Sequence, residues 1–383
     1  MSELINARIR NENFRRALLT NVSLVALMGV VCAPISALAA SADEDRPTVW
    51  IEIGGQLERV DTPQTPFAPP FFGLAQSNVL DAMVDTLRPS RYSIGGEGKI
   101  TLLPATTDWA FSAAARYGRS KNARHLHYQT PGLPSFTERV GAGLTSIKPS
   151  LRNFGDGQSD FAESDFVLDF QAGKDIGLGV FGSSGSSVIS AGVRYAQFTS
   201  SSDAAIHARP VLGYGPAIPV TVIKYHGSVH FPFNQTYTAA LHTTHSTHAV
   251  GPSVSWGASL PVAGKPDGMA VVFDWGVNGA LLFGRQRTSE NHQTTGYGAY
   301  HIGTVKHTHS YAHTAADVRS KAVIIPNIGG FAGISLEVPN GKVSIGYRGD
   351  FFFNATDSGL DAREAANKNF YGPFATISIG LGG

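Results

Sequence analysis

An alternation of apolar and polar residues, repeated along the chain, constrains the fold more than any other feature of this sequence. In the segment 269–283, for example, Val271, Phe273 and Trp275 alternate with Asp274 and Gly276. Successive side chains of a β-strand point to opposite faces, so this pattern predicts a strand that separates two different environments. We predict an all-β protein with ten such strands, at 48–60, 91–102, 109–119, 165–173, 187–197, 250–260, 269–283, 327–338, 342–353 and 371–381.

The lengths of the connections indicate which all-β fold these strands build. A soluble sandwich also alternates, but it does not require short turns at one end and long loops at the other. Here short connections at 104–108, 179–186, 262–268 and 339–341 alternate with long ones at 61–90, 120–162, 200–249, 288–320 and 354–369. That asymmetry is typical of outer-membrane barrels, so we predict a transmembrane antiparallel up-and-down β-barrel with long extracellular loops.

The number of strands is less constrained than the fold. Ten is preferred, but the segments 220–231 and 237–249 could form one more membrane hairpin, which would make twelve. These segments lack a clean apolar face, which favours a hairpin outside the membrane.

The composition excludes three other classes of protein. Hydrophobic residues make up 42% of the chain and charged residues 15%, whereas a disordered chain is poor in apolar residues and rich in charge. Lys and Arg (30) balance Asp and Glu (29), so no nucleic-acid partner is expected. After residue 40 no uninterrupted apolar run reaches the roughly 20 residues that a transmembrane helix needs.

The N-terminal segment has the features of a secretory signal peptide. Four arginines in 8–16 precede an apolar stretch, 17–33, and a run of small residues that ends in Ala39-Ala40. A basic region, a short apolar core and a small-residue cleavage site define such signals. We predict that residues 1–39 are removed and that 40–383 form a single barrel domain, located in the bacterial outer membrane.

Two pairs of strand-like stretches resemble a known family. They are Asp165–Asp175 with Ser187–Phe198, and Gly346–Phe353 with Tyr371–Leu381. These stretches are similar to the Legionella-type major outer membrane protein family of pore-forming barrels. The resemblance implies a bacterial outer-membrane pore former, and it brings no catalytic residues with it.

Charged residues on the polar faces of the predicted strands are the candidate pore lining. Facing acids and arginines could select ions by a transverse field, or they could pair and fill the lumen. Eight-stranded barrels are filled by side chains and sixteen-stranded ones hold a channel, so both outcomes suit ten or twelve strands. The candidates are Glu52, Glu58, Glu97, Lys99, Arg116, Asp165, Asp169, Arg194, Asp274, Arg348 and Asp350.

The lining leaves an open and a filled lumen equally possible, and the resemblance to the pore-forming family favours the open one. We therefore predict a pore that allows passive diffusion of small solutes through a lumen of mixed charge. The alternative is a barrel with a closed lumen that acts as a structural or surface-binding protein, in adhesion or in metal capture.

All thirteen histidines fall in the predicted long loops. In an extended chain His242 and His248 would share a face, as would His307, His309 and His313. Imidazoles that gather on one face can bind zinc or copper, so these five are candidate metal ligands. Two other interpretations stay open: ordinary polar loop residues, or a response to pH, because imidazoles gain charge below about pH 6.5.

No catalytic constellation is evident in the sequence. Neighbours such as His245-Ser246 point to opposite faces of a strand and cannot form a nucleophile–base pair. The nucleophile-elbow and metalloprotease helix motifs are also missing. We therefore predict a non-enzymatic protein that needs no cofactor. The expected partners are outer-membrane lipid and lipopolysaccharide, small solutes and the barrel assembly machinery, with homo-oligomerisation left open.

Overall fold

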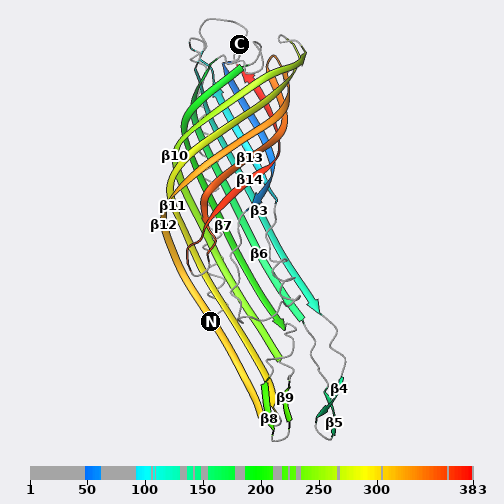
Figure 1. Cartoon of the computed structure of the whole chain (residues 1–383). Helices are drawn as coiled ribbons and strands as arrows, with labels where there is room; N and C mark the ends of the chain where they lie inside the picture. Colours follow the sequence, from blue (N-terminus) through cyan, green and yellow to red (C-terminus); the bar gives the residue numbers. More distant parts are fainter. Residues whose placement is uncertain are drawn as a thin grey trace, which may run out of the picture. The chain divides into compact units, whose positions relative to one another are not determined.

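Ten antiparallel strands close into a barrel in the computed structural model (Figure 1). The order of the strands around the barrel is β1-β14-β13-β12-β11-β10-β7-β6-β3-β2, and β1 pairs with both β14 and β2 to close it. The predicted fold class and the preferred strand number are therefore confirmed. The structure describes residues 48–61, 92–104, 107, 109–129, 136–140, 143–147, 154–176, 186–209, 218–222, 225–229, 234–264, 268–302, 305–359 and 362–381.

The predicted signal peptide, residues 1–39, lies outside the described residues. Within the described ranges, no helix is long and apolar enough to cross a membrane.

The barrel strands differ widely in length. They are β1 (Val49–Asp61), β2 (Tyr92–Leu102), β3 (Trp109–Gln129), β6 (Phe154–Asp175), β7 (Ser186–Arg209), β10 (Asn234–Gly264), β11 (Ala270–Ile302), β12 (Val305–Val338), β13 (Gly341–Asp357) and β14 (Ala365–Leu381).

Two further hairpins stand apart from the barrel sheet. One is β4 (Phe136–Val140) with β5 (Gly143–Ile147), and the other is β8 (Ile218–Val222) with β9 (Tyr225–Val229). The twelve-strand alternative is therefore wrong. Among the described residues, 218–222 pairs with 225–229 and with no barrel strand, whereas 237–249 belongs to β10.

Three of the predicted long loops are wrong in large part, because six strands continue far beyond their predicted ends. The segments 120–162, 200–249 and 288–320 contain the distal parts of β3, β6, β7, β10, β11 and β12. The strand β12 has 34 residues, about 110 Å at ~3.3 Å per residue. It pairs with β11 up to Ile302↔Val305, so a two-residue connection replaces the expected loop 288–320.

These six strands form an open sheet beyond the barrel. The neighbouring strand β2 pairs with β3 only as far as Ile94↔Arg119, and β13 pairs with β12 only as far as Asn327↔Phe352. The strand β13 departs at Asn354, whose φ of 58° is a left-handed conformation that asparagine tolerates well. In the described part of the chain, 120–129 of β3 and 305–326 of β12 consequently form the two edges of a six-stranded sheet, which we call the extension.

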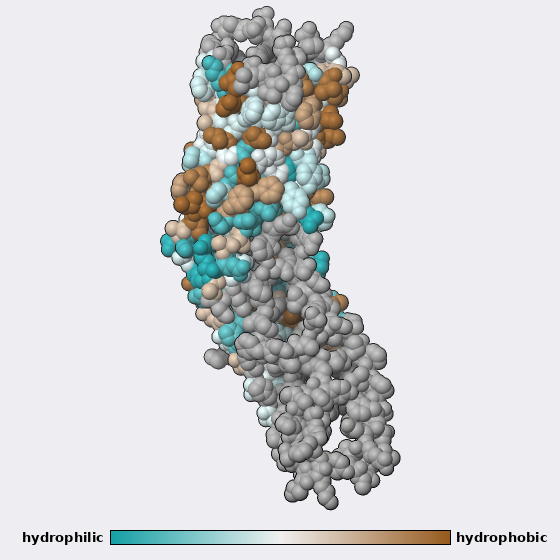
Figure 2. All heavy atoms as spheres, in the orientation of Figure 1, coloured by the Kyte–Doolittle hydropathy of each residue, from teal (hydrophilic) through white to brown (hydrophobic). Residues whose placement is uncertain are grey.

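A belt of exposed apolar side chains surrounds the barrel on its outer face. Figure 2 shows these residues gathered at the end of the molecule that carries the short turns. On β11 the outward row runs from Val271 to Phe283, and the next outward residues are Arg285 and Arg287. Contiguous apolar surface of this extent is unfavourable in water, but it suits the hydrocarbon of a membrane.

Candidate functional site in the barrel lumen

All eleven charged residues of the candidate pore lining lie on the inner face of the barrel. They occupy alternate strand positions opposite to the apolar belt, and five of them are buried: Glu58, Asp165, Arg194, Asp274 and Asp350. The other six are Glu52, Glu97, Lys99, Arg116, Asp169 and Arg348, all of which border the cavity in the lumen. The contacts that these residues make across the lumen decide whether solute could pass.

The cavity occupies the lumen on the side of the short turns and has a volume of about 480 Å³. Lys342 forms an ion pair with Asp274 at 2.8 Å, and Ser378 Oγ donates a hydrogen bond to Glu52 at 3.0 Å. Because its wall carries both signs of charge, the cavity suits water and small polar solutes.

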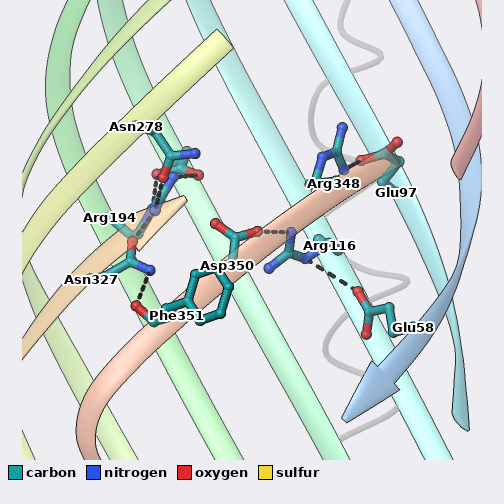
Figure 3. Close-up of polar contacts among 10 residues, drawn as sticks. Glu58, Glu97, Arg116, Arg194, Asn278, Asn327, Arg348, Asp350 and Phe351 are labelled. Carbon is teal, nitrogen blue, oxygen red and sulfur yellow. Dashed lines mark hydrogen bonds and ion pairs between the residues drawn. The ribbon is translucent and has the colours of Figure 1, made fainter. Parts of the chain in front are cut away.

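A layer of arginine–carboxylate contacts crosses the lumen beyond this cavity (Figure 3). Arg116 of β3 donates to Asp350 of β13 at 2.5 Å, and its guanidinium also lies 3.7 Å from Glu58 of β1. Arg348 of β13 pairs with Glu97 of β2. Since β13 is not a neighbour of β2 or β3 in the sheet, these contacts bridge the interior and are not cross-strand pairs.

Arg194 forms the second centre of the charged layer. Its guanidinium binds Asp169 at 2.7 and 3.0 Å and Asn278 at 2.7 Å, and it also donates to Asn327. The Asn327 side chain in turn donates to the carbonyl of Phe351 at 3.1 Å. The carboxylate and amide oxygens of these partners accept hydrogen bonds from the N–H groups of the buried Arg194 guanidinium.

An apolar layer lies next to the charged layer and fills the lumen with aromatic rings. Phe198 of β7 lies 4.8 Å from Phe352 of β13 and 5.8 Å from Phe370 of β14, measured between ring centroids. Phe352 and Phe370 lie 6.1 Å apart, and both are fully buried. Other inward apolar residues complete the cluster: Val60, Val167, Ala196, Ala249, Leu282, Val323, Ile325 and Ala355. Because β7 is several strands away from β13 and β14, this cluster spans the lumen.

A second charged cluster lies beyond the apolar layer, where the extension begins. Lys368 of β14 binds Glu163 of β6 across the interior, and its ammonium lies 5.4 Å from the centre of the Phe198 ring. Arg319 binds Glu290 at 2.9 Å and Asp357 at 3.2 Å. These groups are not predictable from the sequence because their segments carry polar residues on both faces, so no apolar alternation indicates strands there.

Burial shifts two titratable groups in this second cluster, which lies outside the apolar belt. It lowers the pKa of His245 to about 4, against a smaller opposing effect of Asp357. It also raises the pKa of Glu290 to about 7, although the Arg319 guanidinium beside it acts in the opposite direction. Both groups are therefore held in their neutral forms over a wider range of pH than in water.

The shift of His245 predicts a loss of stability in acid. The unfolded chain protonates this imidazole near pH 6.5, whereas the folded protein protonates it near pH 4. The contribution of neutral His245 to the free energy of unfolding is thus fully present above pH 6.5. It is lost as the pH falls towards 4, and the loss amounts to at most about 3 kcal/mol. Replacing His245 with Asn should remove that part of the pH dependence of urea unfolding. The control His242→Asn, in which an exposed histidine is replaced, should leave it unchanged; equal slopes for His245→Asn and the wild type would contradict the assignment.

The structure separates two of the five candidate metal ligands. His242 and His248 share the outward face of β10, but they are six positions apart, about 20 Å along the strand. His242 contacts Asp203 at 2.5 Å, and His248 contacts the Tyr195 hydroxyl at 3.1 Å. His313 faces inward beside His292, with ring centroids 5.3 Å apart.

The side chains of the other two candidates, His307 and His309, lie outside the described residues. Among the side chains that are described, no three His, Cys, Asp or Glu residues are placed to hold a metal ion.

Comparisons with known proteins identify no family for this chain. No protein-family model matches the sequence, and neither does any curated protein. Among solved structures, the chain is similar to a bacterial polysaccharide outer membrane secretin, with 9% identity, 89% of this chain and 100% of that chain covered, and a TM-score of 0.20.

Two other solved structures show the same level of similarity. One is the transport unit of the autotransporter AIDA-I from Escherichia coli, with 8% identity, 90% of this chain and 94% of that chain covered, and a TM-score of 0.20. The other is a mutant of the monoaromatic hydrocarbon channel TodX, with 11% identity and a TM-score of 0.20. The match covers 92% of this chain and 99% of that chain. Similarity at this level carries no argument about function.

Proposed function

We propose that this protein is a bacterial outer-membrane barrel with a blocked lumen, which acts as a structural or surface-binding protein through its extension. The contact of Phe198 with Phe352 and Phe370 across the lumen carries the proposal. Solute passing from the cavity would have to displace this apolar layer and the charged layer next to it. The apolar belt supports the membrane location, and the long distal strands supply a surface outside the membrane.

A diffusion pore is the second candidate function. The 480 Å³ cavity favours it, because solute could enter the lumen from the side of the short turns. The layers that block the path consist of side chains, and side chains can move aside. The resemblance to the Legionella-type family, which implies a pore, stays a prediction.

Conductance distinguishes the two candidates. The full mature chain, reconstituted in planar bilayers, is expected to give no stepwise conductance over a range of voltages. Insertion is checked separately in liposomes, by heat-modifiable migration and protection from protease, so that a silent bilayer is not mistaken for failed insertion. The variant Phe198→Ala/Phe352→Ala/Phe370→Ala combined with Arg116→Ala and Arg348→Ala removes side chains of both layers, and it is expected to conduct if it is folded by the same criterion. Stepwise ohmic conductance from the wild type would overturn the blocked lumen and favour the pore.

Surface exposure of the extension tests the other half of the proposal. An epitope inserted between Ile302 and Val305, at the connection of β11 and β12, is expected to bind antibody on intact cells. Binding only after the outer membrane has been permeabilised would contradict a role at the cell surface.

A further inference from the structure

We propose that two pairs of outward-facing cations bind the phosphate groups of lipid A, the membrane anchor of lipopolysaccharide. The pairs are Arg119 with Lys121 on β3 and Arg285 with Arg287 on β11, and we call them the cation pairs. The inference rests on the outer-membrane location proposed above and names a lipid partner for it.

The cation pairs occupy equivalent positions on their two strands. On β3 the outward row passes from Trp109 and Phe111 to Tyr117, and the next outward residues are Arg119 and Lys121. On β11 the row passes from Val277 and Leu281 to Phe283, and the next are Arg285 and Arg287. All four cations are exposed. In both strands an aromatic residue ends the apolar belt and two cations follow on the same face.

This position matches the level of lipid headgroups. Residues two apart on one face of a strand are separated by about 7 Å along the strand. Arg119 and Arg285 therefore lie within one such step of the last apolar side chains, Tyr117 and Phe283, and the second cation lies one step farther out. The cation pairs are on the side of the long connections, which is the extracellular side of such barrels, where lipopolysaccharide forms the outer leaflet.

The charges of the cation pairs are not neutralised by protein. Among the described side chains none of the four has a carboxylate partner, in contrast to the lumenal Arg116, Arg194 and Arg348, which all do. Arg285 donates to Ser320 Oγ, at 2.7 Å. The lumenal arginines are thus neutralised by carboxylates of the protein, whereas the four residues of the cation pairs can bind an anion from outside the protein.

The surroundings of the β11 pair also suit a phosphorylated sugar. The strand neighbours of Arg287 are Ser246 and Ser320, and the β10 neighbour of Arg285 is His248. Ser246 and His248 hydrogen-bond to each other at 3.0 Å, whereas Ser320 Oγ accepts from Arg285 and still has its hydroxyl hydrogen to donate to a phosphate oxygen. Guanidinium groups bind phosphate in a bidentate manner.

The two cation pairs would bind two different lipid molecules. Going round the barrel through β6, β7 and β10, β11 is four strands from β3, about 19 Å along the wall. At this level the strands already belong to the open sheet of the extension, so the path through β6, β7 and β10 is the one that separates the two pairs.

Lipid retention by the purified protein tests the proposal. Full mature protein in detergent micelles is incubated with bisphosphorylated lipid A or with dephosphorylated lipid A, and the bound lipid is counted by native mass spectrometry. Wild type is expected to retain bisphosphorylated lipid A at least about tenfold better than the variant R119Q/K121Q/R285Q/R287Q, because charge-assisted hydrogen bonds contribute strongly. Heat-modifiable migration confirms that each variant is folded.

A matched control removes cations from the opposite face of the same strands. In R124Q/K321Q both replaced residues are exposed, but they occupy inner-face positions on β3 and β12. This control is expected to retain lipid A like the wild type. Three results would each overturn the proposal. R124Q/K321Q could lose as much bound lipid A as the quadruple variant, or the quadruple variant could retain as much lipid A as the wild type. The wild type could also bind dephosphorylated lipid A as well as the bisphosphorylated form. Displacement of lipid A by inorganic phosphate alone would overturn it too, because it would indicate a simple anion site. Conductance by the wild type would overturn the blocked lumen without affecting these results.

Discussion

Replacing Phe352 with alanine is expected to lower the free energy of unfolding by about 3–5 kcal/mol, the usual cost of deleting a fully buried aromatic side chain. The Phe352 ring is fully buried between Phe198 and Phe370, so its removal leaves a cavity that rings from opposite walls cannot readily fill. Unfolding in urea or guanidinium, followed by tryptophan fluorescence in micelles, measures the change.

The adjacent residue supplies a matched control. Phe351 has the same side chain one position earlier, but it faces outward and is 39% exposed. Phe351→Ala should cost no more than about 2 kcal/mol, because it loses apolar transfer energy without opening a cavity. Phe352→Leu, which nearly conserves volume, should cost less than about 1.5 kcal/mol. A loss for Phe351→Ala as large as that for Phe352→Ala would show that the apolar layer does not stabilise the barrel.

Replacing Lys368 with methionine is expected to cost a similar amount, about 3–5 kcal/mol, for an electrostatic reason. Lys368 and Glu163 are almost completely buried, and their ion pair joins β14 to β6 across the interior. Removing the ammonium takes this partner away from the Glu163 carboxylate, whose charge lies in a poorly solvated place. The same unfolding measurement applies.

The double variant Glu163→Leu/Lys368→Met separates charge from volume. Buried ion pairs replaced by apolar residues of similar size are often close to neutral, so the double variant should recover most of the stability lost in Lys368→Met. The decrease in the free energy of unfolding caused by Lys368→Met should also vary little with salt concentration, because salt screens buried charges weakly. A double variant as unstable as Lys368→Met would assign the effect to packing against Phe198 and Phe370 instead.

Sequence alone could predict the ten strands because lipid imposes an apolar outward face on each of them. In β13, for instance, Val343, Ile345 and Tyr347 face outward while Ser344 and Arg348 face inward. The same alternation placed the eleven lumenal charges on the correct face. Where lipid ends, that constraint ends as well, so the sequence of the extension predicts loops although its backbone remains in strands.

The partners of the inward residues could not be predicted in this way. Arg194 binds Asn278 and Asn327, which lie 84 and 133 positions away in the sequence. Alternation shows which face a residue occupies, but the stagger of the strands decides what lies opposite it across the lumen. The apolar layer was missed for a related reason. Phe198, Phe352 and Phe370 are inward apolar residues, an exception to the pattern that identified the strands.

The pairing of β1 with β14 also determines when this protein can fold. The first and last barrel strands are hydrogen-bonded from Val49↔Leu381 to Asp61↔Asn369, so the barrel cannot close before β14 has been synthesised and delivered. Contacts of such long sequence separation form slowly, and an incomplete sheet has edges that hydrocarbon cannot satisfy. Until all ten strands can close together, the chain therefore has strand edges that must be kept from pairing with other chains.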